Sequence, residues 1–357
     1  MNSTGDNDTT ITDIQHHQCT WFLANDEILH FVHTRLSHVV FSIIIPLVSA
    51  IGLFINASFL FVVFRVQEMR TIPNFYLGSL ALGDMFFVSV QRAIEYLSYR
   101  NAVPFRMEIF GFVFFTNFSC VMANMAGYIF YFNSILMILV STVDRYLAIC
   151  KPMVYREITS KKRALKLVIG CWFMAILFSG FQATYYVKET MCLQWPHGTS
   201  SPTTLKICTT GVPWAPLATM IIDLSTYILA SSMFGFCSVS IVITLNKRIS
   251  SGITENKQNE TINLRDQIAK MVLVNTTVFM LCLAPFQFFN VDWAHYNLTG
   301  SGLFPHEFLS TTAIAGMIAM TVNSLINPLV YLAVSSRYRQ AYKIAFSGQR
   351  TGGGQPK

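Results

Sequence analysis

Charged residues are scarce in this 357-residue chain. Asp, Glu, Lys and Arg together make up 12% of it, against about 25% in ordinary soluble domains. So few charges cannot solvate a globular surface, whereas the 53% hydrophobic content suits a chain that faces lipid. Apolar runs near the length of about 20 residues that a membrane-spanning helix needs occur at 39–64, 75–97, 118–139, 164–186, 212–245, 271–291 and 308–332. We therefore predict an all-α membrane protein, a seven-transmembrane helix bundle.

Lys and Arg are absent from the first 34 residues, which instead carry five acidic residues. Basic residues gather at 151–166 and 337–357, and short loops rich in Lys and Arg stay on the cytoplasmic side of a membrane. We expect a multi-pass protein of the plasma membrane with its N-terminus extracellular. The net charge of +7 then reflects topology, so no nucleic-acid partner is expected. No apolar signal-peptide core is visible near the N-terminus.

Three regions follow from this topology. Residues 1–37 form an extracellular tail, 38–333 the seven-transmembrane domain, and 334–357 a short amphipathic eighth helix on the membrane lipid with a short cytoplasmic tail. In the eighth helix, Tyr338, Tyr342 and Phe346 recur at helical spacing. Asn2, Asn7 and Asn297 begin Asn-x-Ser/Thr sequons on the outer side, which makes them candidate glycosylation sites.

Catalytic and transport signatures are missing. No pair of histidines stands at metal-ligand spacing within the predicted spans, and no internal repeat of the kind common in transporters is visible. An enzyme is not expected, and a transporter is only a distant alternative.

Eight cysteines are present, and four fall on the predicted outer side. Cys120, at the top of the third span, is expected to bond to the second outer loop, where Cys208 and Cys192 compete as its partner; a further pair could involve Cys19. That loop, from about residue 188 to 211, is expected to form a strand hairpin over an open vestibule. Cysteines elsewhere in the chain are expected to be reduced.

Two polar clusters stand at matching ends of predicted spans: Asp144-Arg145-Tyr146 and Asn327-Pro328-Leu329-Val330-Tyr331. With the Gly52–Asn56 segment, the Ser79–Asp84 segment and Trp172 in the same order, they make the chain resemble the rhodopsin-like, or class A, G-protein-coupled receptors from the first span to the eighth helix. The resemblance implies a receptor that binds an extracellular ligand and activates heterotrimeric G proteins, with arrestin as a further partner.

The resemblance assigns a coupling site to the cytoplasmic ends of the spans. Asp144 is expected to hold Arg145 at rest and to release it to the G protein when the sixth helix moves outward, and Tyr331 is expected to support the open state. The residues implied in coupling and activation are Asp144, Arg145, Tyr146, Pro152, Met153, Asn327, Pro328, Tyr331, Phe279, Pro285 and Ile135.

A second implied site surrounds Asp84, an acid in mid-membrane that needs partners. In resting receptors of the family the matching positions enclose a sodium ion; here they are Asp84, Ser134, Asn323, Ser324 and Asn327. The alternative is a hydrogen-bonded polar network without sodium. No cofactor is required beyond this allosteric ion.

Departures from the family pattern concern the switch. Leu283 stands where the sixth helix usually has tryptophan, although Phe279 and the kinking Pro285 remain, and the fifth span has no interior proline. Arg265 stands where many receptors place an acid that locks the arginine of the third helix. These changes leave open a constitutively active or non-signalling receptor.

Ligand classes can be narrowed by two absences. Gly127 stands where amine receptors carry an aspartate, and the seventh span lacks the lysine that retinal needs. A peptide is our first expectation, supported by the long second outer loop and by a first inner loop similar to that of neuropeptide receptors; a lipid or another small molecule is the alternative. Candidate pocket residues are Gln91, Arg92, Glu95, Gly127, Tyr128, Leu283, Gln287, Asn290 and Asp292.

Overall fold

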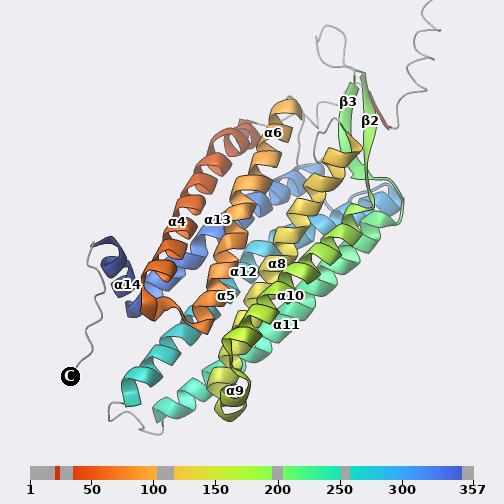
Figure 1. Cartoon of the computed structure of the whole chain (residues 1–357). Coiled ribbons are helices and arrows are strands. Elements are labelled where there is room, and N and C mark those ends of the chain that lie inside the picture. The colour runs from red at the N-terminus through yellow and green to blue at the C-terminus, as the bar shows by residue number, and fades with distance from the viewer. Residues whose placement is uncertain (1–20, 25–34, 103–115, 195–203, 251–257, 348–357) are drawn as a thin grey trace, which may run out of the picture.

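The computed structural model describes residues 21–24, 35–102, 116–194, 204–250 and 258–347. Long helices lie side by side in one bundle, with a small sheet at one end (Figure 1). We call the end that carries the sheet the hairpin end, and the other the α14 end after the short helix there. The helical elements are α3 (Arg35–Val39), η1 (Val40–Ile44), α4 (Ile45–Arg65), η2 (Gln67–Met69), α5 (Ile72–Phe86), η3 (Phe87–Gln91), α6 (Arg92–Ala102), α8 (Asn117–Cys150), α9 (Pro152–Ile158), α10 (Lys161–Ala183), α11 (Ala215–Ser250), α12 (Gln258–Thr299), α13 (His306–Val334) and α14 (Ser336–Phe346).

Six stretches of the described chain are long and apolar enough to cross a membrane: Arg35–Arg65, Asn117–Cys150, Lys161–Ala183, Ala215–Lys247, Ala269–Tyr296 and Thr311–Val334. The seventh spanning stretch is α5, η3 and α6, which continue one another from Ile72 to Ala102 through a π-helical turn. Asp84, Arg92 and Glu95 make this stretch less apolar than its neighbours. The prediction of an all-α, seven-helix membrane bundle is confirmed.

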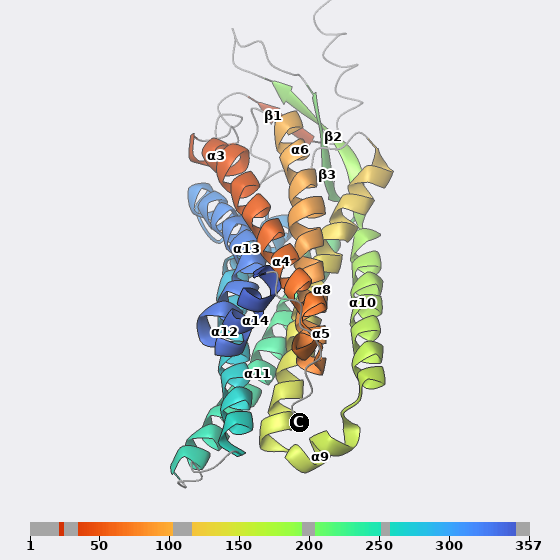
Figure 2. The same cartoon turned by 60° about the vertical axis from the view of Figure 1, so that its left-hand side comes forward.

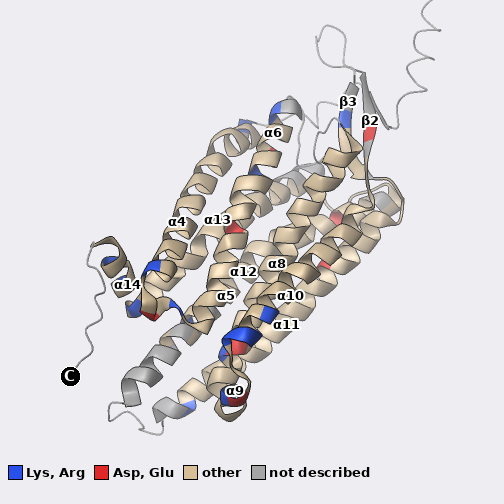
Figure 3. Ribbon diagram, viewed as in Figure 1, with Lys and Arg blue, Asp and Glu red and all other residues tan. Residues whose placement is uncertain are grey.

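The surface of the bundle is apolar where a membrane would contact it. Phe54, Leu229 and Leu281 are each about seven-tenths exposed, on three different helices. In Figure 3, Lys and Arg gather mainly at the ends of the helices, and their middle parts are largely free of charge. An exposed apolar belt of this kind excludes water and fits a multi-pass membrane protein.

Several helix ends differ from the sequence prediction. The fourth span, predicted to reach Tyr186, ends at Ala183, because Tyr186 begins a β-strand that pairs with the outer loop. The fifth, predicted from Val212, begins at Ala215, with Pro216 in its first turn, where a missing N–H costs nothing. The sixth is much longer than predicted, because its polar flanks continue the helix beyond the apolar core.

The sheet consists of β1 (Trp21–Ala24), β2 (Tyr186–Gln194) and β3 (Thr204–Thr210). β2 and β3 form the predicted antiparallel hairpin, and β1 pairs in parallel with β2. A disulfide between Cys120 and Cys208, with the two Cα atoms 5.6 Å apart, fixes β3 to the start of α8. Of the two partners that the sequence left open for Cys120, the structure has Cys208. Cys150, Cys171, Cys237 and Cys282 are free, as predicted, and Cys19 lies outside the described residues.

The predicted eighth helix is α14, which follows α13 and lies at the side of the bundle, against α13 and α4 (Figure 2). Its buried Tyr338 donates a hydrogen bond to the Asn74 side chain, and its ring is tilted against that of Tyr331, with ring centroids 5.6 Å apart. Phe346 is exposed but lies against Phe61 of α4, with ring centroids 5.5 Å apart. Packing on α4 therefore holds α14 in place.

Candidate ligand and signalling sites

Arg145 lies near the α14 end of α8 and is buried. Its guanidinium donates a hydrogen bond to the neighbouring Asp144 carboxylate, and the two form an ion pair. About one turn away along the helix, the hydroxyls of Thr142 and Thr276 lie 3.2 Å apart and join α8 to α12. The arginine is therefore buried and paired with its neighbouring acid, close to a polar contact between α8 and α12.

Next to Arg145, the short α9 presents an apolar side chain to the cytoplasmic side predicted from the sequence. Pro152 occupies the first turn of α9, and Met153 is 70% exposed. A methionine exposed on the short helix that follows α8 is suited to packing into a partner protein. Tyr146 packs against Phe236 of α11, with ring centroids 5.5 Å apart, so it is part of the bundle wall and does not stand free.

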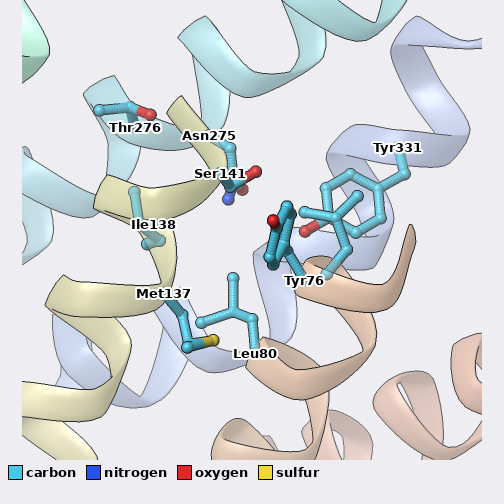
Figure 4. Close-up of a pocket in the computed structure, with 9 residues that line it drawn as sticks. Tyr76, Leu80, Met137, Ile138, Ser141, Asn275, Thr276 and Tyr331 are labelled. Atoms are coloured by element: carbon cyan, nitrogen blue, oxygen red, sulfur yellow. The ribbon is translucent and has the colours of Figure 1, made fainter. Parts of the chain in front are cut away.

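A small cavity separates this end from the middle of the bundle (Figure 4). Tyr331 and Asn275 face it from α13 and α12, and the hydroxyl of Tyr331 and the amide oxygen of Asn275 have no hydrogen-bond partner among the described residues. Tyr331 packs outward on Phe59, with ring centroids 5.2 Å apart. Buried polar atoms of this kind accept ordered water.

The core beside this cavity contains two of the residues that the resemblance implies in activation. Ile135 and Phe279 are buried in one apolar cluster with Leu283. Pro285 lies inside α12, where it removes one backbone hydrogen bond. Leu283, predicted as a pocket residue, belongs to this apolar core.

Asp84 is buried in the middle of the bundle and accepts a hydrogen bond from Asn327 Nδ2 at 2.7 Å. The amide oxygens of Asn323 and Asn327 are buried, and neither has a hydrogen-bond partner in the described part of the chain. Asn56 supports the same region by donating to Ser324 O at 2.7 Å. A carboxylate with open amide oxygens matches the oxygen ligands of a hard cation, so these residues fit a sodium ion.

The two remaining members of the expected sodium set contribute less. The Ser324 hydroxyl donates to Met320 O of its own helix at 3.3 Å. Ser134 is half-buried. Pro328 lies inside α13 beside Asn327, so the motif residues belong to one continuous helix.

Near the hairpin end, Arg92 and Glu95 form a buried ion pair one turn apart on α6. The Arg92 guanidinium also lies over the Phe87 ring, 4.4 Å from its centroid, and Gln91 Nε2 donates to Glu95 Oε1 at 3.2 Å. Gly127 faces Gln91: a Cβ there would lie 3.2 Å from Gln91 Nε2. The glycine therefore leaves room for this polar side chain.

The other predicted pocket residues belong to different groups. Asp292 Oδ1 accepts the backbone N–H groups of Leu303 and Phe304 at 2.8 and 3.0 Å, so it caps a loop. Tyr128 contacts Tyr186 of the hairpin, with 3.2 Å between their hydroxyls. Asn2 and Asn7 lie outside the described residues, and nothing is described of the Asn297 side chain.

One buried acid was missed by the sequence analysis. Asp223 of α11 is fully buried, and it accepts hydrogen bonds from Gln182 Nε2 at 3.0 Å and from Asn290 Nδ2 at 3.3 Å. Asp223 is the only charged residue between Val212 and Leu245. A lone acid inside an apolar span is a functional candidate by default, and that signal could have identified it. One of its hydrogen-bond partners, Asn290, was among the predicted pocket residues.

Comparison with known proteins agrees with this architecture. The sequence model of the family described as 7 transmembrane receptor (rhodopsin family) matches residues 55–331. The substance-P receptor of Rattus norvegicus is 22% identical over 312 residues, covering 85% of this chain and 69% of that receptor. The neuromedin-K receptor of Mus musculus is 24% identical over 323 residues, covering 88% and 65%. The neuromedin-U receptor 1 of Mus musculus is 24% identical over 323 residues, covering 83% and 70%.

Proposed function

Because the chain belongs to the rhodopsin family of seven-transmembrane receptors, we propose that it is a plasma-membrane receptor for an extracellular peptide that activates heterotrimeric G proteins. The observation that carries the proposal is that the two ends of the bundle are built differently. A disulfide-tethered hairpin stands at one end, and a buried arginine held by its neighbouring acid lies towards the other. Such an arrangement joins a binding surface to a closed coupling surface.

The orientation is supported by charge. The basic segment 151–166 and the basic α14 lie away from the hairpin, and basic short loops favour the cytoplasm. With the hairpin outside, the N-terminus is extracellular, and α14 lies along the inner leaflet. The G protein, and arrestin after it, would then bind at the α14 end.

A peptide ligand is supported by the shape of the hairpin end and by the relatives. The strands β2 and β3 stand upright beside the helix ends and extend beyond the bundle (Figure 1). The similar substance-P, neuromedin-K and neuromedin-U receptors are named for peptides. An edge strand also offers backbone groups to a peptide.

We also propose that Asp84 and the amide oxygens beside it bind sodium in the resting receptor. The bound ion would offset the cost of a buried carboxylate. Leaving Asp84 without a cation would relax the packing of α5 against α13, so sodium would favour the closed state.

The proposal can be tested in cells that express the chain with sensors for each class of Gα subunit. Pools of synthetic peptides should contain an agonist, and Arg145→Ala should remove the response while surface expression remains. Lys166→Ala, which removes an exposed cation of α10, serves as a matched control and should respond normally. An equal response from Arg145→Ala would contradict the coupling role, and a receptor that answers lipids but no peptide would contradict the ligand class.

A further inference from the structure

The buried Asp223 is the feature of the hairpin half that the proposed function leaves unexplained. It lies eight residues into α11, about 12 Å along the helix axis at 1.5 Å per residue. Gln182, one residue before the end of α10, and Asn290 of α12 both donate to its carboxylate. Three helices therefore meet at one acid close to the base of the hairpin.

No cation neutralises this carboxylate within the described ranges. The ion pairs there join Arg92 with Glu95 and Arg145 with Asp144, and none includes Asp223. A charge buried without an opposite charge is costly in a membrane protein. Two amide donors reduce that cost, but the site still lacks a positive group.

The other buried acids near the hairpin end are held in other ways. Glu95 is paired with Arg92. Asp292 accepts backbone N–H groups of a loop through Oδ1. Its buried Oδ2 has no hydrogen-bond partner among the described residues and lies 3.5 Å from where a Cβ on Gly302 would stand, so it faces the loop backbone. Asp223 is the one described acid of this region that is held by neutral side chains alone.

The polar atoms around Asp223 that lack a hydrogen-bond partner are mainly acceptors. Gln182 Nε2 donates to Asp223 Oδ1, and Gln287 Nε2 donates to the Tyr131 hydroxyl at 3.1 Å. The amide oxygens of both glutamines are buried, and neither has a hydrogen-bond partner in the described structure. A carboxylate with open amide oxygens requires a ligand group that carries several N–H donors.

Aromatic side chains complete the surroundings. Tyr128 and Tyr186 contact each other through their hydroxyls. Burial raises the pKa of Tyr186, which lies outside the spans, to about 12, and the negative charge of Asp223 also raises it. Asp223 is thus within electrostatic reach of the hairpin. Tyrosine rings favour a nearby cation through their π-faces.

We propose that Asp223 anchors a cationic group of the agonist, a guanidinium or an ammonium, which enters beneath the hairpin and is surrounded by Gln182, Gln287 and the tyrosines. This inference rests on the proposed peptide receptor and specifies the chemistry of its ligand: a basic side chain or a free amino terminus. Amine receptors carry an aspartate on the third span where this chain has Gly127, and here Gln91 fills that space. In this chain the acid that would bind a cation is on α11 instead.

The test compares four pools of C-terminally amidated pentapeptides in cells with G-protein sensors. Three pools are N-acetylated and contain a basic residue, an acidic residue without a base, or neutral residues; the fourth has neutral side chains and a free amino terminus. We expect agonists in the basic or free-amine pools. Agonists found only among the acetylated neutral or acidic peptides would overturn the cationic anchor and leave the peptide receptor intact.

The agonist is then compared with a neutral isostere, citrulline for arginine, acetyl-lysine for lysine, or an acetylated amino terminus. Removing the cation should lower potency about 100-fold at the unmodified receptor, the scale of a buried charge pair. At Asp223→Asn the two peptides should be equally weak. Ser225→Ala, on the exposed side of α11, is the matched control and should keep the full difference. An equal loss at the unmodified receptor and at Asp223→Asn would overturn the pairing.

If no peptide pool activates the receptor, the peptide proposal fails. A second measurement then tests whether Asp223 binds a cationic group. Purified full-length receptor is heated with millimolar N-acetyl-arginine amide or N-acetyl-citrulline amide, which differ in charge only at the side chain. Stabilisation by the arginine compound alone, lost in Asp223→Asn, supports the anchor. Equal behaviour of the two amides, or of the two proteins, overturns it.

Discussion

The buried ion pair of Arg92 and Glu95 gives a sharp prediction for stability. Their side chains are only 3% and 8% exposed, so water screens neither charge. Glu95→Gln would leave the Arg92 guanidinium buried without its carboxylate, although the Phe87 ring still faces it. Removing one partner of a buried pair costs about 3–5 kcal/mol. We therefore expect a clear fall in the apparent Tm of receptor purified into lipid nanodiscs.

Replacing both partners tests whether the two charges stabilise the receptor as a pair or independently. Arg92→Met combined with Glu95→Leu removes both charges and keeps apolar volume, and such replacements are often neutral or stabilising. The double variant should regain most of the lost Tm, whereas Glu157→Gln, which neutralises an exposed acid of α9, should change little. A double variant as unstable as Glu95→Gln, or a Glu95→Gln receptor as stable as the unmodified one, would show that the two charges do not stabilise each other.

Further predictions concern three other contacts. Cys208→Ser should reduce surface expression or agonist potency because the hairpin loses its tether to α8, and a fully functional variant in a cell-surface binding assay would count against that tether. Asp84→Asn should abolish the dependence of agonist affinity on sodium, measured with potassium as the control salt; a dependence that survives would place the cation elsewhere. Tyr338→Phe removes a buried hydrogen bond to Asn74 and should lower stability by about 1 kcal/mol; an unchanged Tm would show that packing alone holds α14.

Hydropathy and charge alone predicted the helix bundle and the eighth helix, because lipid constrains the length and composition of spanning helices so strongly. Helix ends were less accurate. Tyr186 was assigned to a helix because it is apolar enough, but pairing with β3 places it in a strand. Helix continuation of polar flanks, as in α12, has no hydropathy signal at all.

The sites show the same division. Residues in fixed motifs, such as Arg145 and Asp84, could be located from their order in the chain. The choice of Cys208 over Cys192 depended on the hairpin register, and the burial of Glu95 with Arg92 depended on packing, neither of which a single sequence determines. Asp223 was within reach of the sequence, since it is the only charge in its span, but its partners on α10 and α12 are more than 40 residues away along the chain.

We expect that binding at the hairpin end opens the end of the bundle where Arg145 lies. The most direct test is nucleotide exchange by purified heterotrimeric G proteins mixed with the purified receptor in nanodiscs, with and without an agonist from the peptide pools. We expect the agonist to accelerate exchange for at least one G protein, and Arg145→Ala to abolish this acceleration while still binding the peptide. Acceleration that persists in Arg145→Ala would contradict this mechanism. So would an agonist that binds the receptor but leaves nucleotide exchange unchanged for every G protein tested.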